Sequence, residues 1–222
     1  MLHCGDRYGL IDGDEIELHE SHEFCEELFK ECPNHVTLNG YFQSEKYFKN
    51  AEKLVRLDFR FKEHIIEEVE DHFSSYLNEE PVCILVRDFN PDYDYPNCEN
   101  NHINIPSEFY EKSIDILGRD RIYIICSNNI EQTKKQNVFQ GDNFIFNEVV
   151  PDDIYKGHFD LCLMSMCQDF IISNSTFAWW GAWLGTGIGK RVLIPTPWYG
   201  PGLSHISTDD LYPDEWEKIE WK

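Results

Sequence analysis

The stretch that most constrains the fold runs from residue 160 to residue 184 and reads DLCLMSMCQDFIISNSTFAWWGAWL. Its middle, Phe170 to Ser173, is short, apolar and β-branched, which is typical of a strand buried on both faces of a parallel sheet. Three polar residues interrupt the apolar pattern, and Phe177 begins a run with helical spacing. The hydroxyls of the turn are suited to cap that helix. The stretch therefore predicts a strand, a polar turn and a helix N-terminus, and such an N-terminus suits phosphate groups.

Two other interpretations of this stretch remain open, and a third is excluded by its residues. A capping Ser or Thr contributes about 1 kcal/mol without any ligand, so the hydroxyls alone do not indicate binding. Trp179, Trp180 and Trp183 are equally compatible with a packed core. A membrane span is excluded, because the polar turn and four glycines interrupt the apolar run from residue 170 to 189.

The chain from residue 82 onward alternates short apolar runs with helical patterns. The predicted strands are 82–86, 122–126, 144–146, 170–173 and 192–194, and a helix is expected at 213–219 near the C-terminus. Such alternation predicts an α/β fold with a doubly wound parallel sheet. Helices are predicted before it, from about Ser21 to Pro33, from Ser44 to Leu57 and from Phe61 to Leu77. We place a domain boundary at the polar segment before residue 81, which gives domains 1–80 and 81–222.

The charge of the chain excludes some classes of partner. It has 41 Asp and Glu against 19 Lys and Arg, a formal net charge of −22. Nucleic acids and anionic membranes bind basic patches, so we expect neither as a partner. Eight cysteines lie at scattered spacings without a CxxC motif, which favours free thiols in a reducing compartment over a disulfide framework. No signal peptide or transmembrane segment is visible, so we expect a cytoplasmic location.

Two segments resemble a known family. Residues 160–184 are similar to the C-terminal motif of the α-1,2-fucosyltransferases, glycosyltransferase family 11, which runs DL-x-LMS-x-C followed by NS(S/T)F(S/A)WWGAWL. Residues 38–48, LNGYFQSEKYF, resemble the LxGYFQSEKYF segment of the same enzymes. The two segments lie over a hundred residues apart and in the family's order, and the resemblance extends over about residues 35–222.

The resemblance implies a fold, a reaction and partners. It implies the two-lobed GT-B architecture, in which a Rossmann-like nucleotide lobe follows an N-terminal lobe. That first lobe is abbreviated here, because nothing before Ser21 matches the family's GGLGNQ-type turn. The implied reaction is an inverting, metal-independent transfer of L-fucose from GDP-fucose to a galactose-containing glycan, with no obligatory cofactor. If the first lobe is naturally short, a homodimer is a candidate for completing the acceptor side.

Candidate site residues follow the predicted strands, where ligands bind in doubly wound sheets. Arg87 stands where the family has the first arginine of an HxRRGD motif, and it is the catalytic candidate, stabilising charge on the β-phosphate. The same motif is altered at three positions, which carry Leu85, Asp88 and Asn90. An ordinary ion pair with nearby carboxylates is the competing interpretation of Arg87.

The other candidates are assigned to the nucleotide donor. Asp160 matches the aspartate that accepts hydrogen bonds from guanine, although a solvated acid or a helix-terminal charge is an equally open interpretation. The remaining donor-binding candidates are Ser127, Asn128, Asn174, Ser175, Thr176 and Phe177. Asp92 and Asp94 form a DxD pattern without a matching third ligand, so no metal site is expected. A related transferase with another donor or acceptor, an inactive nucleotide-sugar-binding protein and a plain α/β scaffold stay open as alternatives.

Overall fold

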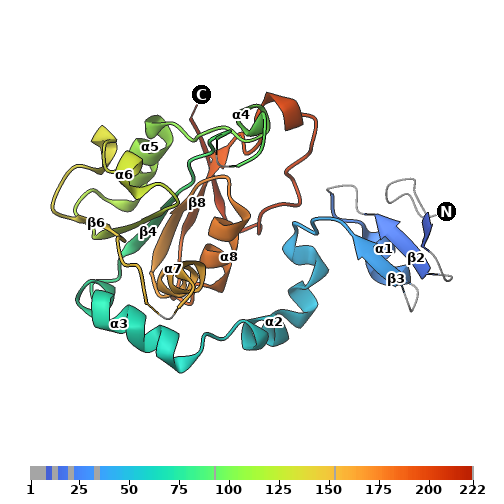
Figure 1. Ribbon diagram of the computed structural model, residues 1–222, viewed down its shortest axis with the longest axis horizontal. Coiled ribbons are helices and arrows are strands. Elements are labelled where there is room, and N and C mark those ends of the chain that lie inside the picture. The colour runs from blue at the N-terminus through green and yellow to red at the C-terminus, as the bar shows by residue number, and fades with distance from the viewer. Residues whose placement is uncertain are drawn as a thin grey trace. The chain divides into compact units, whose positions relative to one another are not determined.

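The computed structural model describes residues 9–11, 15–19, 23–32, 36–92, 94–152 and 154–221. The chain forms two compact units (Figure 1): residues 1–58 with 204–214 make unit 1, and residues 59–203 with 215–222 make unit 2. The units divide at residue 58, whereas the sequence placed the boundary before residue 81. Helix α3 (Glu63–Leu77) accounts for the difference, because its apolar face packs against helix α7 (Lys156–Ser165) of unit 2.

Unit 1 is built on a three-stranded sheet. Strand β2 (Glu15–His19) pairs antiparallel with β1 (Gly9–Ile11) and parallel with β3 (Val36–Asn39). Helix α1 (Glu26–Glu31) begins at Cys25, whose sulfur accepts a hydrogen bond from the Leu28 amide at 3.3 Å. The predicted cap of this helix, Ser21, lies outside the described residues. A small apolar core therefore supports the sheet at the start of α1.

The helix predicted from Ser44 to Leu57 is broken into three parts. Ser44 does cap a helical segment, but that segment is a 3-10 turn, Glu45–Tyr47, followed by a second one, Lys49–Ala51. Only α2 (Glu52–Asp58) is α-helical. The break lies at Phe48, whose backbone is not helical (ψ 4°). The amphipathic pattern predicts the helical character but not this interruption.

Unit 2 contains a six-stranded sheet in the order β6-β5-β4-β7-β8-β9. All five neighbouring pairs are parallel. The strands are β4 (Val82–Val86), β5 (Tyr123–Ser127), β6 (Phe144–Phe146), β7 (Asp169–Ile172), β8 (Val192–Thr196) and β9 (Glu217–Glu220). Counted within the unit this is the order 3-2-1-4-5-6 of dinucleotide-binding folds, and the order reverses between β4 and β7. The predicted α/β class with a doubly wound parallel sheet is confirmed.

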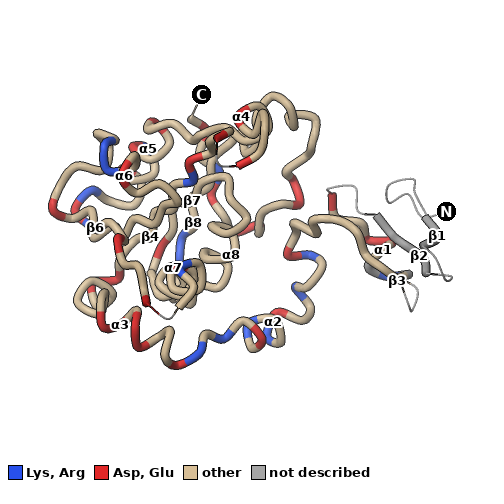
Figure 2. The backbone as a smooth tube through the Cα atoms, in the orientation of Figure 1, with Lys and Arg blue, Asp and Glu red and all other residues tan. Residues whose placement is uncertain are grey.

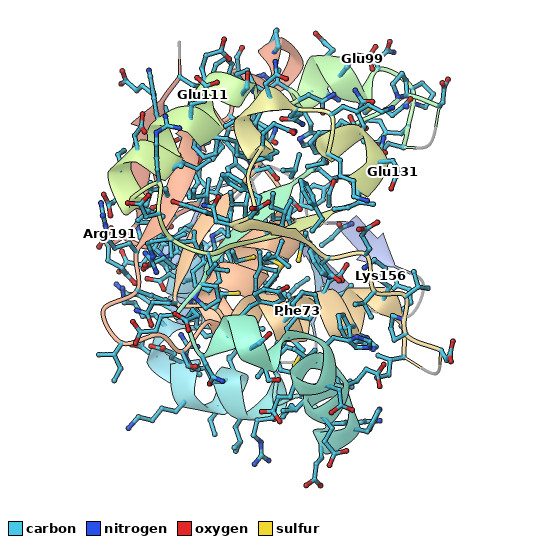
Figure 3. All side chains as sticks on the ribbon, turned by 90° about the vertical axis from the view of Figure 1, so that its left-hand side faces the viewer. Phe73, Glu99, Glu111, Glu131, Lys156 and Arg191 are labelled. Atoms are coloured by element: carbon cyan, nitrogen blue, oxygen red, sulfur yellow. The ribbon has the colours of Figure 1, made fainter. Side chains whose placement is uncertain are left out.

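Helices cover both faces of this sheet. Alternate residues of β4, Val82, Ile84 and Val86, join the core on the face of α5 (Ser107–Leu117). The opposite face is covered by α7 and α8 (Thr176–Leu184), which pack against each other, and α3 packs on α7. Phe73 of α3, labelled in Figure 3, is buried with its ring 6.3 Å from that of Phe159. Both faces of the sheet are therefore shielded from solvent by helices, as the continuous apolar strands predict.

The helix predicted at 213–219 is wrong, since residues 217–220 form strand β9. This strand pairs with β8 in the register Leu193 to Glu217 and Pro195 to Ile219. Its side chains alternate between half-buried and exposed, which is the period of an edge strand and not of a helix. Two short helices, α4 (Cys98–Asn101) and α6 (Ile130–Thr133), complete the unit.

The cysteines only partly match the expectation of free thiols. Five of them, Cys83, Cys98, Cys126, Cys162 and Cys167, are free and buried, and Cys32 is free and exposed. Cys25 is disulfide-bonded, which corrects the expectation for that position. Among the described residues, no helix is both long and apolar enough to cross a membrane.

Candidate functional site

The carboxyl ends of β4, β5 and β7 bring most of the predicted residues to one edge of the sheet. Arg87 follows β4, Ser127 ends β5, and the polar turn before α8 follows β7. Because strands β4 and β7 flank the point where the strand order reverses, a crevice is expected there. The sequence-based placement of these residues at the same edge is thus reproduced by the sheet.

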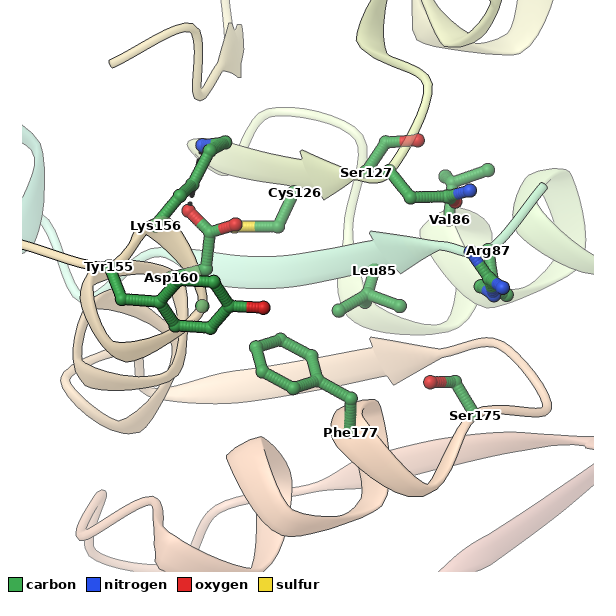
Figure 4. A pocket seen from close by; sticks show the side chains of 12 residues that line it. Leu85, Val86, Arg87, Cys126, Ser127, Tyr155, Lys156, Asp160, Ser175 and Phe177 are labelled. Atoms are coloured by element: carbon green, nitrogen blue, oxygen red, sulfur yellow. Dashed lines mark hydrogen bonds and ion pairs between the residues drawn. The ribbon is translucent and has the colours of Figure 1, made fainter. Parts of the chain in front are cut away.

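A pocket of about 450 Å³ opens at this edge (Figure 4). Its lining residues are Leu85, Val86, Arg87, Cys126, Ser127, Asn128, Tyr155, Lys156, Gly157, Asp160, Ser175 and Phe177. Six of the eight residues singled out in the sequence are among them. Asn174 and Thr176 do not line this pocket. Figure 4 shows Asp160 and Tyr155 at one end and Arg87 at the other, with Phe177 between them.

Asp160 lies in the second turn of α7 and is held by two donors. Its Oδ1 accepts a hydrogen bond from Asn147 Nδ2 at 2.7 Å and one from Lys156 Nζ at 2.9 Å. None of the hydrogen bonds within the described part of the chain uses its Oδ2. Burial raises the pKa of the Asp160 carboxyl, and the Lys156 ammonium and Asn147 amide only partly offset that rise. The site thus holds a partly desolvated carboxylate with one oxygen left for a ligand.

Arg87 is fixed by three neighbours. Its backbone amide donates to Ser173 Oγ at 3.1 Å, and its guanidinium lies over the Phe89 ring, 4.8 Å from the centroid. The guanidinium also forms an ion pair with Asp94. Asp94 is itself held, because its second oxygen accepts the Asn90 amide at 2.9 Å. The loop after β4 therefore presents Arg87 in one orientation, and the ion pair anticipated in the sequence is present.

Ser175 and Asn174, in the polar turn before α8, have different structural roles. Ser175 caps the helix by accepting a hydrogen bond from the Ala178 amide at 3.4 Å, and its side chain also lines the pocket. Asn174 is buried and donates from Nδ2 to the carbonyls of Ile103 and Trp198, both at 3.0 Å. Asn174 thus joins two loops outside the pocket. Phe177 contributes a partly exposed ring to the pocket wall.

The altered motif after β4 makes a structural link to β5. Asn128 Oδ1 accepts from the Asp88 amide, and Asn128 Nδ2 donates to the Asp88 carbonyl, both at 2.8 Å. The Asp88 carboxylate accepts from Asn129 Nδ2 at 2.7 Å and from Asn104 Nδ2 at 3.4 Å. Asp88 stands where the family has a second arginine, and amides surround its charge here. Asp88 therefore holds the loop after β4 to the residues that follow β5, at the edge of the pocket.

The long segment after Asp88 is ordered by contacts with the end of unit 2. The amide of Gly200 donates to the Asn101 carbonyl at 2.8 Å, and α4 packs against the 3-10 turn Pro201–Leu203. A Cβ on Gly200 would lie 2.5 Å from the Asn100 carbonyl oxygen, so this approach requires glycine. The sequence left open whether the segment is an ordered loop or a flexible lid, and the described part is ordered.

Apart from Leu85, Val86 and Cys126, which belong to predicted strands, three pocket residues escaped the sequence analysis: Tyr155, Lys156 and Gly157. Lys156 and Asp160 are four residues apart on α7, the spacing of a helical ion pair, and this signal could have been used. Tyr155 precedes the helix and is 75% exposed, and nothing in its local pattern marks it. No cluster of metal-ligating side chains is found within the described ranges. In the DxD pattern, Asp94 is occupied by Arg87, and Tyr93 lies outside the described residues.

The fold and the site together define a class of protein. A parallel sheet of this strand order, with a pocket at its reversal point that combines an arginine, a helix N-terminus and a half-buried carboxylate, has the architecture of nucleotide-binding α/β proteins. The chain belongs to glycosyl transferase family 11, whose model matches residues 19–220. The resemblance inferred from the sequence is therefore confirmed.

Two curated relatives come from Escherichia coli. The O-antigen biosynthesis glycosyltransferase WbnK is 26% identical over 85% of this chain and 64% of its own length. An alpha-1,2-colitosyltransferase is 26% identical over 90% of this chain and 68% of its own length. The chain thus spans about two thirds of the length of these relatives.

Solved structures are more distant. POFUT1 in complex with GDP-fucose has a TM-score of 0.46 and 13% identity, covering 76% of this chain and 57% of that one. A glycosyl transferase of family 9 from Veillonella parvula has a TM-score of 0.42 and 14% identity, covering 72% and 41%.

Proposed function

We propose that this chain is an α-1,2-fucosyltransferase that moves L-fucose from GDP-fucose to a hydroxyl of a galactose-containing glycan. The observation that carries the proposal is the pocket at the reversal point, which has a carboxylate at one end and an arginine at the other. Membership of glycosyl transferase family 11 supports the reaction class.

In this proposal the Asp160 end receives the guanine. Guanine presents two adjacent N–H donors, and a carboxylate accepts such a pair in a way that uracil or adenine cannot match. Asn147 and Lys156 occupy both lone pairs of Oδ1, so the two guanine N–H groups share the two lone pairs of Oδ2 in this proposal. The rings of Tyr155 and Phe177 line the same part of the pocket and offer apolar surface to a planar base (Figure 4).

The Arg87 end then receives the diphosphate. The Arg87 guanidinium and the N-terminus of α8 place positive charge where the β-phosphate gains negative charge during transfer. In the step itself the acceptor oxygen forms a bond to C1 of the sugar while the bond from C1 to the diphosphate oxygen breaks, which inverts C1. GDP leaves with the electron pair, and the acceptor proton passes to solvent. The protein's cations take the charge, so no metal ion is needed.

The test is a transfer assay with GDP-fucose and lactose, in the presence and absence of EDTA. The proposal expects a fucosylated product with an α-1,2 linkage, which NMR identifies, and equal rates with the chelator. Loss of an arginine that stabilises a transition state typically costs about 3 kcal/mol, so Arg87→Ala should slow transfer about a hundredfold. GDP binding without product from any galactoside would favour an inactive nucleotide-sugar-binding protein.

A second candidate is a transferase of the same reaction type with another donor sugar. Two observations favour it: one relative is named as a colitosyltransferase, and the motif around Arg87 is altered at Leu85, Asp88 and Asn90. Competition between GDP-fucose and a colitosyl donor in the same assay separates the two. The preferred donor is the one with the higher kcat/KM.

A further inference from the structure

A second pocket, of about 460 Å³, lies in unit 2 beside the one described above. Its lining includes Arg60, Lys62, His64 and His158, and no acidic side chain is found among the described residues that line it. Such a lining departs from the rest of the chain, which has 41 acidic against 19 basic residues. Figure 2 shows blue on the segment that leads into α3, which carries Arg60 and Lys62 in the sequence.

Three of the basic side chains of this pocket, Lys62, His64 and His158, are not consumed by ion pairs among the described residues. None of the ion pairs found among the described residues involves Lys62, His64 or His158. The neighbouring acids in the sequence, Glu63 and Asp152, are exposed and do not line the pocket. Other lysines of this acidic chain, such as Lys134 with Glu131 and Glu148, are paired. The pocket therefore holds a local excess of hydrogen-bond donors.

The shape of the pocket restricts what it can hold. Ile65, which is buried, and Ile154 form an apolar floor, and the Tyr155 ring forms a wall. The hydrogen-bond donors come from two segments of the chain. Lys62 and His64 lie at the start of α3, and His158 lies in the first turn of α7, so donors from both segments line a space of small-molecule size. A phosphate group matches this arrangement, because its three terminal oxygens accept hydrogen bonds from several directions.

The second pocket also has a defined place relative to the first. Tyr155 lines both pockets, so they adjoin at this residue. In the first pocket Tyr155 lies at the end opposite Arg87 (Figure 4). A group bound in the second pocket is thus separated from the diphosphate position by the length of the first pocket.

We propose that this second pocket is a binding site for the phosphate group of a small phosphate monoester, separate from the nucleotide donor. The site takes the phosphate through Lys62, His64 and His158, and the apolar floor takes the organic part. It does not depend on which sugar nucleotide the first pocket binds. The proposal goes beyond the donor site, and its ligand is a second molecule.

The experiment follows the imidazole signals of the full chain by NMR during titration with inorganic phosphate and with glycerol phosphate. Sodium chloride holds the ionic strength constant, and His64→Gln and His158→Gln assign the two signals. The proposal expects saturable shifts of both signals, at the same phosphate concentrations, and a weaker affinity in Lys62→Ala by about fivefold or more. Lys135→Ala, which removes an equally exposed lysine outside the pocket, should bind as the wild type does.

Several results would overturn the proposal. The signals of His64 and His158 would not move, or they would move equally with chloride, or Lys62→Ala would bind like the wild type. Binding only to vesicles of phosphatidylcholine with phosphatidic acid, and not to either free phosphate, would assign the surface to a lipid headgroup and refute the small-molecule site. The titration is run with and without GDP, so a failure of GDP to bind leaves this test intact and bears only on the donor proposal.

Discussion

Asp160 lines the candidate pocket in an environment that disfavours its charge. Its carboxylate is partly desolvated, and the Lys156 and Asn147 hydrogen bonds do not restore its usual pKa of 3.8. The ionised form is therefore less favourable in the folded chain than in the unfolded chain. A carboxylate that destabilises the fold and faces a pocket is typical of a functional position.

Replacing Asp160 by Asn removes the ionisable carboxyl, which lets its effect on stability be measured apart from its effect on binding. Because the folded-state pKa is raised, its stabilising contribution is present below 3.8 and is lost as pH rises through the folded pKa. At neutral pH we thus expect Asp160→Asn to unfold at the same or a higher temperature than the wild type, with the difference shrinking on acidification. Thermal scans from pH 4 to 8 measure this, with the exposed Asp142→Asn as the control. A lower melting temperature for Asp160→Asn at neutral pH would contradict the assignment.

Arg87 depends on the shape of its guanidinium as well as its charge. The guanidinium pairs with Asp94 and lies on the Phe89 ring, and an ammonium reproduces neither planar contact. We expect Arg87→Lys to weaken GDP binding about tenfold, which corresponds to about 1.4 kcal/mol. Arg191→Lys is the matched control, since Arg191 pairs with Glu217 at 2.7 and 2.8 Å outside the pocket. Equal affinities for the two variants would count against Arg87 as a donor contact.

Helices α7 and α8 position the pocket by packing unusually close. A Cβ on Gly181 of α8 would lie 2.3 Å from Met164 Cε and 3.1 Å from Met164 Cβ on α7. Glycine in a helix interior normally costs about 1 kcal/mol relative to alanine, so its presence here indicates a steric requirement. This contact explains why a glycine, Gly181, lies between the tryptophans of the sequence motif.

Gly181→Ala should therefore destabilise the chain, although alanine favours the helix. We expect a loss of about 1–3 kcal/mol in the free energy of unfolding from overpacking, measured by urea denaturation. In a Met164→Ala background the loss should become smaller, because most of the clashing atoms are removed. A stabilising Gly181→Ala, or equal effects in both backgrounds, would show that the helices do not need this approach.

The elements also show what the sequence can and cannot predict. Strands 82–86 and 144–146 match because continuous apolar runs leave few alternatives, and the polar turn after β7 was located by its break in pattern. Strand β9 was predicted as a helix because three of the four residues from Glu217 to Glu220 are charged, and only its pairing with β8 makes it a strand. The position of Tyr155 in the pocket depends on how the loops fold back, and so does the choice of Asp94 as the carboxylate that pairs with Arg87. Hydrophobic periodicity does not encode either.

At the scale of the whole molecule, the excess of negative charge is the dominant long-range force. A formal net charge of −22 on 222 residues makes the folded chain repel itself more than an expanded one does. Salt screens such repulsion, and the Debye length falls to about 3 Å at 1 M. We therefore expect the melting temperature to rise as sodium chloride is raised from low to moderate concentration. A melting temperature that falls would mean that attractive ion pairs dominate instead.

The strand order of unit 2 links the whole chain to its function. It brings the ends of β4 and β7, which are far apart in sequence, to the one edge where Arg87 and Ser175 share a pocket with Asp160. The central claim is that this pocket holds a guanine nucleotide.

The most direct test is calorimetric titration of the chain with GDP and with UDP, on the wild type and on Asp160→Asn. The account predicts micromolar binding of GDP, a preference for GDP over UDP, and a loss of about 10- to 100-fold in GDP affinity in the variant, as for a hydrogen bond to a charged group. The variant should bind UDP as the wild type does. Equal affinity of the wild-type chain for both nucleotides, or no heat from either with a folded chain, would contradict it.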